Sequence, residues 1–160
     1  MHTLTVRKAA FSDLPAIVNL LIEDELGQTR EKVGDIIDQR YISAFEHIDS
    51  DSNQYLMVVE NTEQQIIATC HLTIMPSLTF IGSTRMQIEA VRVSSRYRGQ
   101  KIGEWMMNAA FEWAKTNDVY AILNFLWFDQ QVKLKRWIAH FFINTYTNCM
   151  RQHFSCNTVG

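Results

Sequence analysis

Apolar residues along the first 123 positions recur at two spacings, one typical of strands and one typical of helices. Leu4 and Val6 alternate with polar neighbours, which predicts a short strand. Between Ser12 and Glu25 apolar residues recur at helical spacing after a capping residue and a proline, so we expect a first helix there. Gly27 follows and is expected to end that helix.

A second helical period covers residues 30–48, and the polar run DSDSNQ at 49–54 is expected to end it. The order of elements leaves two alternatives for this helix, one over a binding cleft and one that only packs in the core. The pattern then changes to that of strands in YLMVVEN at 55–61 and QQIIATCHLTIMP at 64–76, which predicts an antiparallel hairpin. We expect a loop or second hairpin connection at 77–85, SLTFIGSTR, and a further strand at Arg85–Val93.

Residues 88–103, IEAVRVSSRYRGQKIG, run directly into the helical pattern EWMMNAAFEWAKTN at 104–117. This order predicts a strand, a tight turn containing Gly99 and Gly103, and a helix. The first amides of a helix are unpaired and lie at the positive end of its dipole, so such a turn can bind an anion. The segment therefore predicts a pyrophosphate site, with an ordinary strand-to-helix turn bearing basic side chains as the alternative.

Length and composition indicate the number of domains and the distribution of charge along the chain. A chain of 160 residues with 47% hydrophobic residues is expected to form one soluble domain, residues 1–160. The net charge of −2 argues against a general nucleic-acid or membrane binder. Residues 1–123 hold 11 basic and 16 acidic side chains, whereas residues 124–160 hold 4 basic and 1 acidic. Residues 124–160 therefore carry a net positive charge, whereas the rest of the chain carries a net negative charge.

The cysteines and the N-terminal residues indicate a compartment. Cys70, Cys149 and Cys156 are odd in number and widely separated, which fits neither a disulfide framework nor a zinc site. The first residues have no apolar signal region, and no run of about 18 apolar residues suggests a membrane span. We therefore expect a cytoplasmic protein without a metal.

The segment 88–115 resembles the acetyl-coenzyme A signature of the GNAT N-acetyltransferase family, a strand xxLxVxxxxRGxGIG followed by a helix. The opening LTVRKAAFSDLPAIVNL resembles the first strand and helix of that family, so the resemblance covers residues 3–123. It implies an α/β fold of the α+β type, with a mixed, mostly antiparallel sheet flanked by helices. The fourth and fifth strands of that sheet would part to admit the cofactor. Residues 75–93 are also similar to small-molecule amine acetyltransferases of the aminoalkylphosphonate type.

The resemblance implies acetyl-coenzyme A as the cofactor and assigns residues to it. Val91 and Val93 fall where backbone groups of the fourth strand hold the pantetheine arm as an added strand. The pyrophosphate loop would consist of Arg98, Gly99, Gln100, Lys101, Ile102 and Gly103. Lys101 departs from the family, which most often has glycine there, and this is compatible with the loop if its backbone stays in an allowed region.

Glu89 is the candidate general base, which accepts the amine proton through water. It stands two residues before Val91, so we expect both on one face of the strand. The alternative is a surface glutamate paired with Arg85 or Arg92. His71 on the preceding strand is a candidate to assist it.

Two residues of the connection at 77–85 and the acidic residues of the first two helices bear on the acceptor. Ser77 and Thr79 are candidates to line the acceptor pocket. The acidic residues would favour a cationic acceptor or else form a solvated face. They are Glu23, Asp24, Glu25, Glu31, Asp35 and Asp38.

The proton donor falls in residues 124–160, where the resemblance ends. The family has a helix AxxFYxxxGF whose tyrosine is the frequent general acid. Phe142 stands in that place here and has no proton to give. Tyr146, one helical turn later, replaces it if the helix is shifted in register. This segment is either a genuine variant, whose amphipathic C-terminal helix mediates self-association, or the product of a shifted coding frame.

Three functions follow. The first is transfer of an acetyl group from acetyl-coenzyme A to a primary amine of a small molecule, directly in a ternary complex of a homodimeric enzyme. The second is a catalytically impaired coenzyme A-binding domain that lacks the acid and the last strand. The third is an interaction module in which the glycine turn is incidental.

Overall fold

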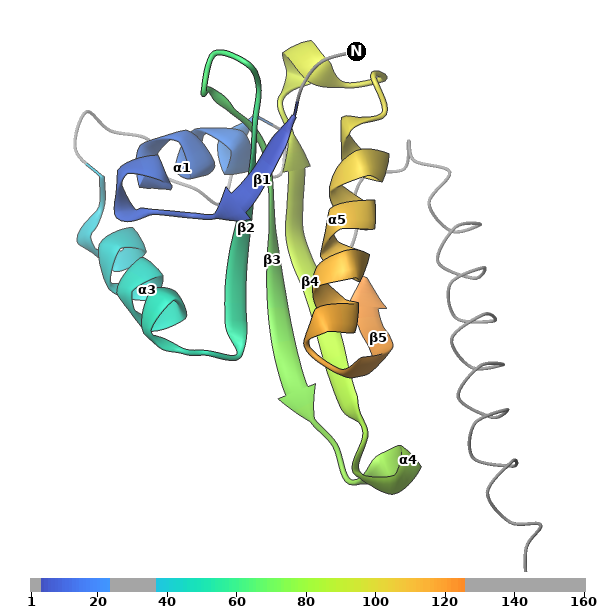
Figure 1. Cartoon of the computed structure of the whole chain (residues 1–160). Coiled ribbons are helices and arrows are strands. Elements are labelled where there is room, and N and C mark those ends of the chain that lie inside the picture. Colours follow the sequence, from blue (N-terminus) through green and yellow to red (C-terminus); the bar gives the residue numbers. More distant parts are fainter. Residues whose placement is uncertain (1–3, 24–36, 126–160) are drawn as a thin grey trace, which may run out of the picture.

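The computed structural model describes residues 4–23 and 37–125, and within them five strands form one sheet (Figure 1). In spatial order the strands are β1 (Thr5–Lys8), β2 (Gln54–Glu60), β3 (Ile66–Pro76), β4 (Thr84–Val93) and β5 (Val119–Phe125). The helices are α1 (Leu14–Ile22), α3 (Gln39–Ser50), the one-turn α4 (Thr79–Gly82) and α5 (Ile102–Thr116), with 3-10 turns η1 (Phe11–Asp13) and η2 (Ser95–Tyr97).

The directions of the strands confirm the predicted fold class. Strands β1 to β4 each run antiparallel to their neighbours, and β5 alone runs parallel, beside β4. A parallel pair needs a crossover connection, and α5 supplies it. The result is a mixed, mostly antiparallel sheet with helices on both faces.

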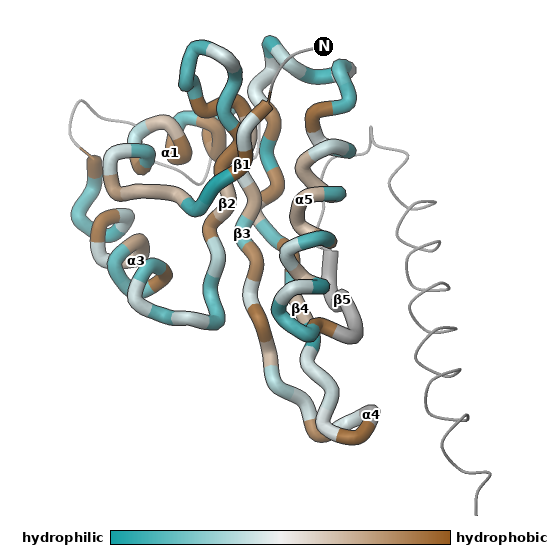
Figure 2. Tube along the Cα trace, viewed as in Figure 1, coloured by the Kyte–Doolittle hydropathy of each residue, from teal (hydrophilic) through white to brown (hydrophobic). Residues whose placement is uncertain are grey.

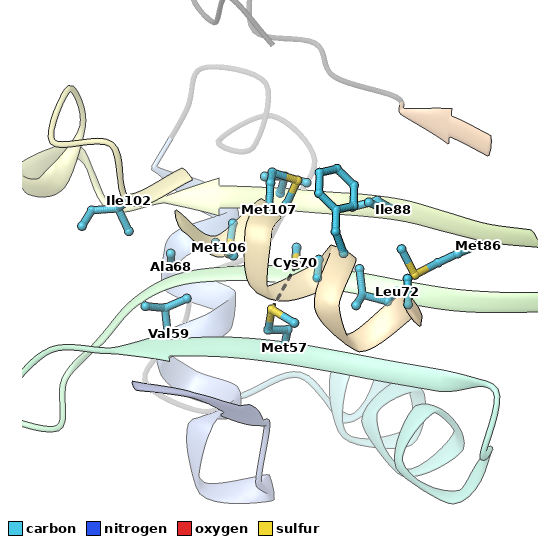
Figure 3. Packing of buried hydrophobic residues seen from close by; sticks show 14 of the residues in the cluster. Met57, Val59, Ala68, Cys70, Leu72, Met86, Ile88, Ile102, Met106 and Met107 are labelled. Carbon is cyan, nitrogen blue, oxygen red and sulfur yellow. Dashed lines mark hydrogen bonds between the residues drawn. The ribbon is translucent and has the colours of Figure 1, made fainter. Parts of the chain in front are cut away.

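One face of the sheet is covered by α5 (Figure 3). Its buried residues recur at helical spacing from Ile102 to Ala114, so they form a single apolar stripe. Cys70 lies under this stripe, with its sulfur 3.8 Å from that of Met57, and burial raises the pKa of its thiol to about 12. The cluster also contains Val59, Ala68, Leu72, Met86, Ile88, Val91, Met106 and Met107.

The other face is covered by α1 and α3, which pack over β2 and β3. Their cluster consists of Ala9, Leu14, Ile17, Val18, Phe45, Leu56 and Val58. The rings of Phe11 and Phe45 meet edge to face at 5.9 Å, which ties the turn before α1 to α3. Hydrophobic positions follow the strands, while the connection from β4 to α5 is polar (Figure 2).

Two helices differ from their predicted bounds. The first was expected at Ser12–Glu25, but a 3-10 turn occupies its start, and α1 ends at Ile22. The second begins at Gln39 rather than at residue 30. Asp38 has an extended backbone and caps α3 by accepting a hydrogen bond from the Arg40 amide at 2.9 Å. Residues 24–36, which include Gly27, lie outside the described residues.

The connection from β3 to β4 contains the short helix α4 in addition to the expected loop. Gly82 ends this turn with a φ of 76°. Leu78 and Ile81 are 98% and 89% exposed. The tip of this long hairpin therefore presents apolar side chains beyond the rest of the fold (Figures 1 and 2).

A buried charged network joins β1, the start of α1 and β2. Arg7 donates from Nη1 to Asp13 Oδ2 at 2.6 Å and from Nε to Glu60 Oε1 at 2.9 Å. Asp13, whose side chain is 9% exposed, also accepts from the Ala10 amide at 2.7 Å. The hydrogen-bonded guanidinium of Arg7 holds the pKa of the Asp13 carboxyl below its ordinary value. This network fixes the direction in which the chain enters α1.

Asp13→Asn is expected to lower the free energy of unfolding by about 2–3 kcal/mol at neutral pH, because Arg7 loses a buried charged partner. Since the native carboxyl has the lower pKa, its contribution is complete above the ordinary aspartate value of about 3.9 and is lost as pH falls through the native value. Urea denaturation at several pH values measures both effects.

Asp49→Asn is the matched control, since Asp49 pairs with Lys8 at 2.7 Å but is 53% exposed. It should cost less than about 0.5 kcal/mol. Equal losses in the two variants would contradict a structural role for the buried network.

Candidate active site

Strands β4 and β5 part halfway along β4. Their pairing runs from Thr84 to Ile88, where Ile88 faces Phe125. Beyond Ile88, β4 stays paired with β3, through His71 with Glu89 and Ala68 with Val93. Within the described residues, the other edge of β4 therefore has no partner strand from residue 89 to residue 93. An extended ligand can pair with such an open edge.

A bulge at Ala90 marks the start of this open edge. Ala90 has a φ of 50°, and the register with β3 shifts between Thr69 and His71. Val91 is buried in the cluster under α5, whereas Glu89 pairs with His71 on the other face. The expectation that Glu89 and Val91 share a face is therefore wrong, because the extra residue reverses the alternation of side chains.

The loop before α5 presents unpaired backbone amides. The first helical hydrogen bond runs from the Trp105 amide to the Lys101 carbonyl at 3.0 Å. Residues 98–101 form a turn, and in the described part of the chain the amides of residues 99–104 make no close backbone hydrogen bond. Gly99 has a φ of 76°, and Lys101 caps the helix with a φ of 63° and a ψ of 15°. Lys101 thus adopts the left-handed conformation that glycine adopts at lower cost, by roughly 1 kcal/mol.

Glu23, at the end of α1, holds the start of this loop. Its carboxylate accepts from the Ser95 amide at 2.5 Å and from the Ser94 hydroxyl at 3.1 Å. At the other end, Arg98 Nε donates to the Val93 carbonyl at 3.2 Å. From the sequence, Glu23 was expected either to favour a cationic acceptor with the other acidic residues of the first two helices or to form part of a solvated face. No local signal connects it with serines about 70 residues away.

Glu89 lies on the α1 face of the sheet and both of its oxygens have polar neighbours. His71 Nδ1 is 3.3 Å from Oε1, and Gln87 Nε2 donates to Oε2 at 2.8 Å. The Glu89 side chain is 40% exposed and that of His71 is 13% exposed. Burial lowers the pKa of His71, and the neighbouring carboxylate opposes this only in part. The imidazole is therefore neutral at neutral pH beside an accessible carboxylate.

Ser77 and Thr79 do not join this group. Their hydroxyls contact each other at 2.8 Å in the connection at the tip of the hairpin. Pro76, the end of β3, is five residues beyond His71, or about 17 Å along an extended strand. These residues stabilise the turn, and the structure places them away from Glu89.

A model of the acetyltransferase (GNAT) family matches residues 15–134. The chain belongs to this family. The match continues past Leu123, where the resemblance was expected to end, and stops at residue 134. Members of the GNAT family use acetyl-coenzyme A to acetylate an acceptor, which agrees with an open strand edge beside a loop of free amides.

Solved structures support the GNAT assignment. A transcriptional regulator from Bacillus halodurans C-125 is 34% identical, with a TM-score of 0.76 over 86% of this chain and 91% of that chain. Glucosamine-6-phosphate N-acetyltransferase from Arabidopsis thaliana is 25% identical, with a TM-score of 0.66 over 92% and 90%. A predicted acetyltransferase from Clostridium acetobutylicum, solved with acetyl-coenzyme A, is 20% identical with a TM-score of 0.66 over 84% and 88%, and shares the fold.

The GNAT fold brings most of the predicted site residues to one region of β4 and α5. Val91 and Val93 lie on the open edge of β4, Arg98–Lys101 form the turn before α5, and Ile102 and Gly103 are the first residues of α5. Their roles stay predictions, as does that of Tyr146, which lies outside the described residues. Gln87 was not among the predicted site residues, and Glu23 was named only as an acidic residue that favours a cationic acceptor or forms a solvated face, not as an anchor of the loop. In the described part of the chain, no helix is long and apolar enough to cross a membrane, and no cluster of His, Cys, Asp or Glu could hold a metal ion.

Proposed function

We propose that the protein transfers an acetyl group from acetyl-coenzyme A to a primary amine of a small molecule, directly within a ternary complex. The observation that carries this proposal is the open edge of β4 at residues 89–93, continuous with the free amides before α5. One stretch of chain thus offers an open strand edge for pantetheine, backbone amides for pyrophosphate beyond one end of that edge and the Glu89 carboxylate at its other end.

The residues present fit the cofactor. The backbone of Val91 and Val93 would hold the pantetheine arm as an added strand. The amides of Arg98–Gly103 would bind the pyrophosphate oxygens, with the helix dipole of α5 in support. Bound acetyl-coenzyme A supplies the activated thioester. In the described structure the carbonyls of Val91 and Val93 accept hydrogen bonds from the side chains of Arg92 and Arg98, which would be exchanged for the ligand.

The proposed chemistry needs the amine in its neutral form. With acetyl-coenzyme A bound, the amine nitrogen would attack the thioester carbonyl, and Glu89 would take up, through water, the proton that this nitrogen loses as the C–N bond forms. The C–S bond would break and Tyr146, the proposed donor, would give a proton to the leaving sulfur, so that the proton held by Glu89 balances the one lost by Tyr146. The bulge at Ala90 puts Glu89 on the face opposite Val91, so we place the acceptor on the α1 side of β4 and the cofactor at its edge.

Gly103→Ala separates cofactor binding from folding. A Cβ at this position would meet only the Val93 side chain at 3.7 Å, an ordinary contact, so the fold itself does not require glycine. Alanine also favours a helix. We expect unchanged or higher thermal stability without ligand and about tenfold weaker coenzyme A binding, because the phosphate must approach the backbone closely.

Calorimetric titration with coenzyme A and with acetyl-coenzyme A measures this difference. If neither compound binds to the wild-type protein, the result would favour the alternative function, an interaction module. Binding with equal affinity by the wild type and Gly103→Ala would contradict the placement of the pyrophosphate.

Glu89→Gln tests the base. It keeps the shape of the side chain but cannot accept a proton, so the rate with a panel of small primary amines should fall by about 100-fold. Release of free thiol measures this rate. Acetyl-coenzyme A binding should not change, which serves as the control for folding. An unchanged rate and pH profile would refute the assignment of Glu89, and binding without turnover in the wild type would favour the impaired domain.

We also propose a homodimer in a reducing compartment, the cytoplasm. The cysteine pattern supports the compartment, and apolar residues at helical spacing in 124–160 support self-association. Light scattering of the full chain should give about twice 18.6 kDa. Ile138→Glu should dissociate the dimer, whereas Leu78→Ser at the hairpin tip should not. A monomer at all concentrations would instead support the frame-shift account of this segment.

A further inference from the structure

We propose that His71 is the positioning residue of Glu89, whose carboxylate it and Gln87 hold from two sides for the incoming amine. The inference rests on the proposed function and extends it from one residue to a group of three. Glu89 would meet the acceptor or its bridging water, and His71 would act only through Glu89.

The sheet brings these residues together. His71 pairs with Leu56 of β2 on one side and with Glu89 of β4 on the other. Glu89 is also the last residue before the bulge, so it is the last position of β4 that keeps the regular alternation with Gln87. Both donors are therefore fixed by the backbone of the sheet, and the carboxylate is oriented where β4 leaves β5.

The side chains of Glu89 and His71 differ in burial, and this difference indicates a different role for each. The Glu89 side chain is 40% exposed and that of His71 is 13% exposed. The Nε2 atom of His71 is buried and has no hydrogen-bond partner among the described residues. A small amine can therefore reach the carboxylate more readily than the imidazole, whose Nε2 is buried. This accessibility makes Glu89 the group that exchanges protons and His71 the group that holds it.

The surroundings also fix where His71 carries its proton. A hydrogen on Nδ1 can bond to Glu89 Oε1, whereas a hydrogen on Nε2 would be a buried donor without an acceptor. Burial lowers the pKa of His71, so the ring is neutral at neutral pH. The neutral ring with Nδ1–H is the form that satisfies the carboxylate.

Within the described residues, the charged side chains that share this face of β4 with Glu89 are two arginines. On the same face, β4 contributes Arg85 and Arg92, while β2 contributes the apolar Leu56. Helix α1, which packs against β3 and β4, has no charged residue between Leu14 and Ile22. Asp13 and Glu23 at its ends are bound to Arg7 and to the start of the α5 loop.

Two substitutions at His71 test the proposal. His71→Asn keeps an N–H donor about as far along the side chain as Nδ1, whereas His71→Leu removes both ring nitrogens at similar volume. A carboxylate that loses a donor is protonated at higher pH. For His71→Leu we expect about tenfold lower kcat/KM for the amine. The acidic limb of the pH profile of kcat/KM, where activity falls as pH decreases, should move to higher pH by about 0.5–1 pH unit. The KM for acetyl-coenzyme A should not change.

His71→Asn should keep kcat/KM within about threefold of the wild type and its acidic limb in place. If the pH profile of His71→Leu has its acidic limb at the same pH as the wild type, the residue is only structural and the proposal is wrong. If His71→Asn is as impaired as His71→Leu, the imidazole itself exchanges the proton, which also overturns it.

A measurement without turnover separates this inference from the proposed function. The 15N shifts of the His71 ring, assigned by their loss in His71→Asn, should report a protonated Nδ1 and a bare Nε2 at neutral pH. The opposite tautomer would refute the positioning role even in an active enzyme. If Glu89→Gln leaves the rate unchanged while the Nδ1–H tautomer is found, the base assignment fails and the contact remains structural.

Discussion

The parting of β4 from β5 at the bulge of Ala90 is the constraint on which the site depends. From Glu89 to Val93, β4 stays beside β3 on one side, with Glu89, Arg92 and Val93 paired, and its other edge has no partner strand among the described residues, so a ligand can complete the sheet there. The same bulge reverses the side chains beyond it. Val91 and Val93 then belong to the α5 side, whereas Glu89 belongs to the α1 side with His71.

As a result, the two faces of the sheet contribute different parts of the site. The α5 face carries the larger apolar cluster, which fixes the start of α5 and with it the unpaired amides of the loop (Figure 3). The α1 face carries the polar group around Glu89. Helix α1 links the two, because its first turn is fixed by the Arg7 network and Glu23 beyond its end binds Ser94 and Ser95. The position of the loop therefore depends on both faces.

Much of the architecture was predictable because its signals are local. The strand pattern of 55–76, the turn at Gly99 and the helix after it depend on residues near one another in the chain, and the structure confirms them. The helix begins at Ile102, so Gly103 lies inside it rather than in the preceding turn. The start of α3 was predicted too early, because the apolar residues at 33–37 continue the helical spacing of the sequence, whereas Asp38 has an extended backbone and caps α3 from outside it. The GNAT signature was recognisable although Lys101 stands where the family most often has glycine. The structure accommodates this difference, because Lys101 adopts the left-handed conformation.

The sequence by itself determined the order of elements in the described part of the chain, the turn before α5 and the family, all of which depend on spacing along the chain. Only the tertiary structure decided which face Glu89 occupies, which residues hold its carboxylate and what anchors the loop. The reason is that strand register is a non-local property: Ala90 carries no glycine or proline signal for a bulge, and His71 meets Glu89 only because β3 and β4 pair in that register. A shift of one residue would have put the carboxylate on the other face.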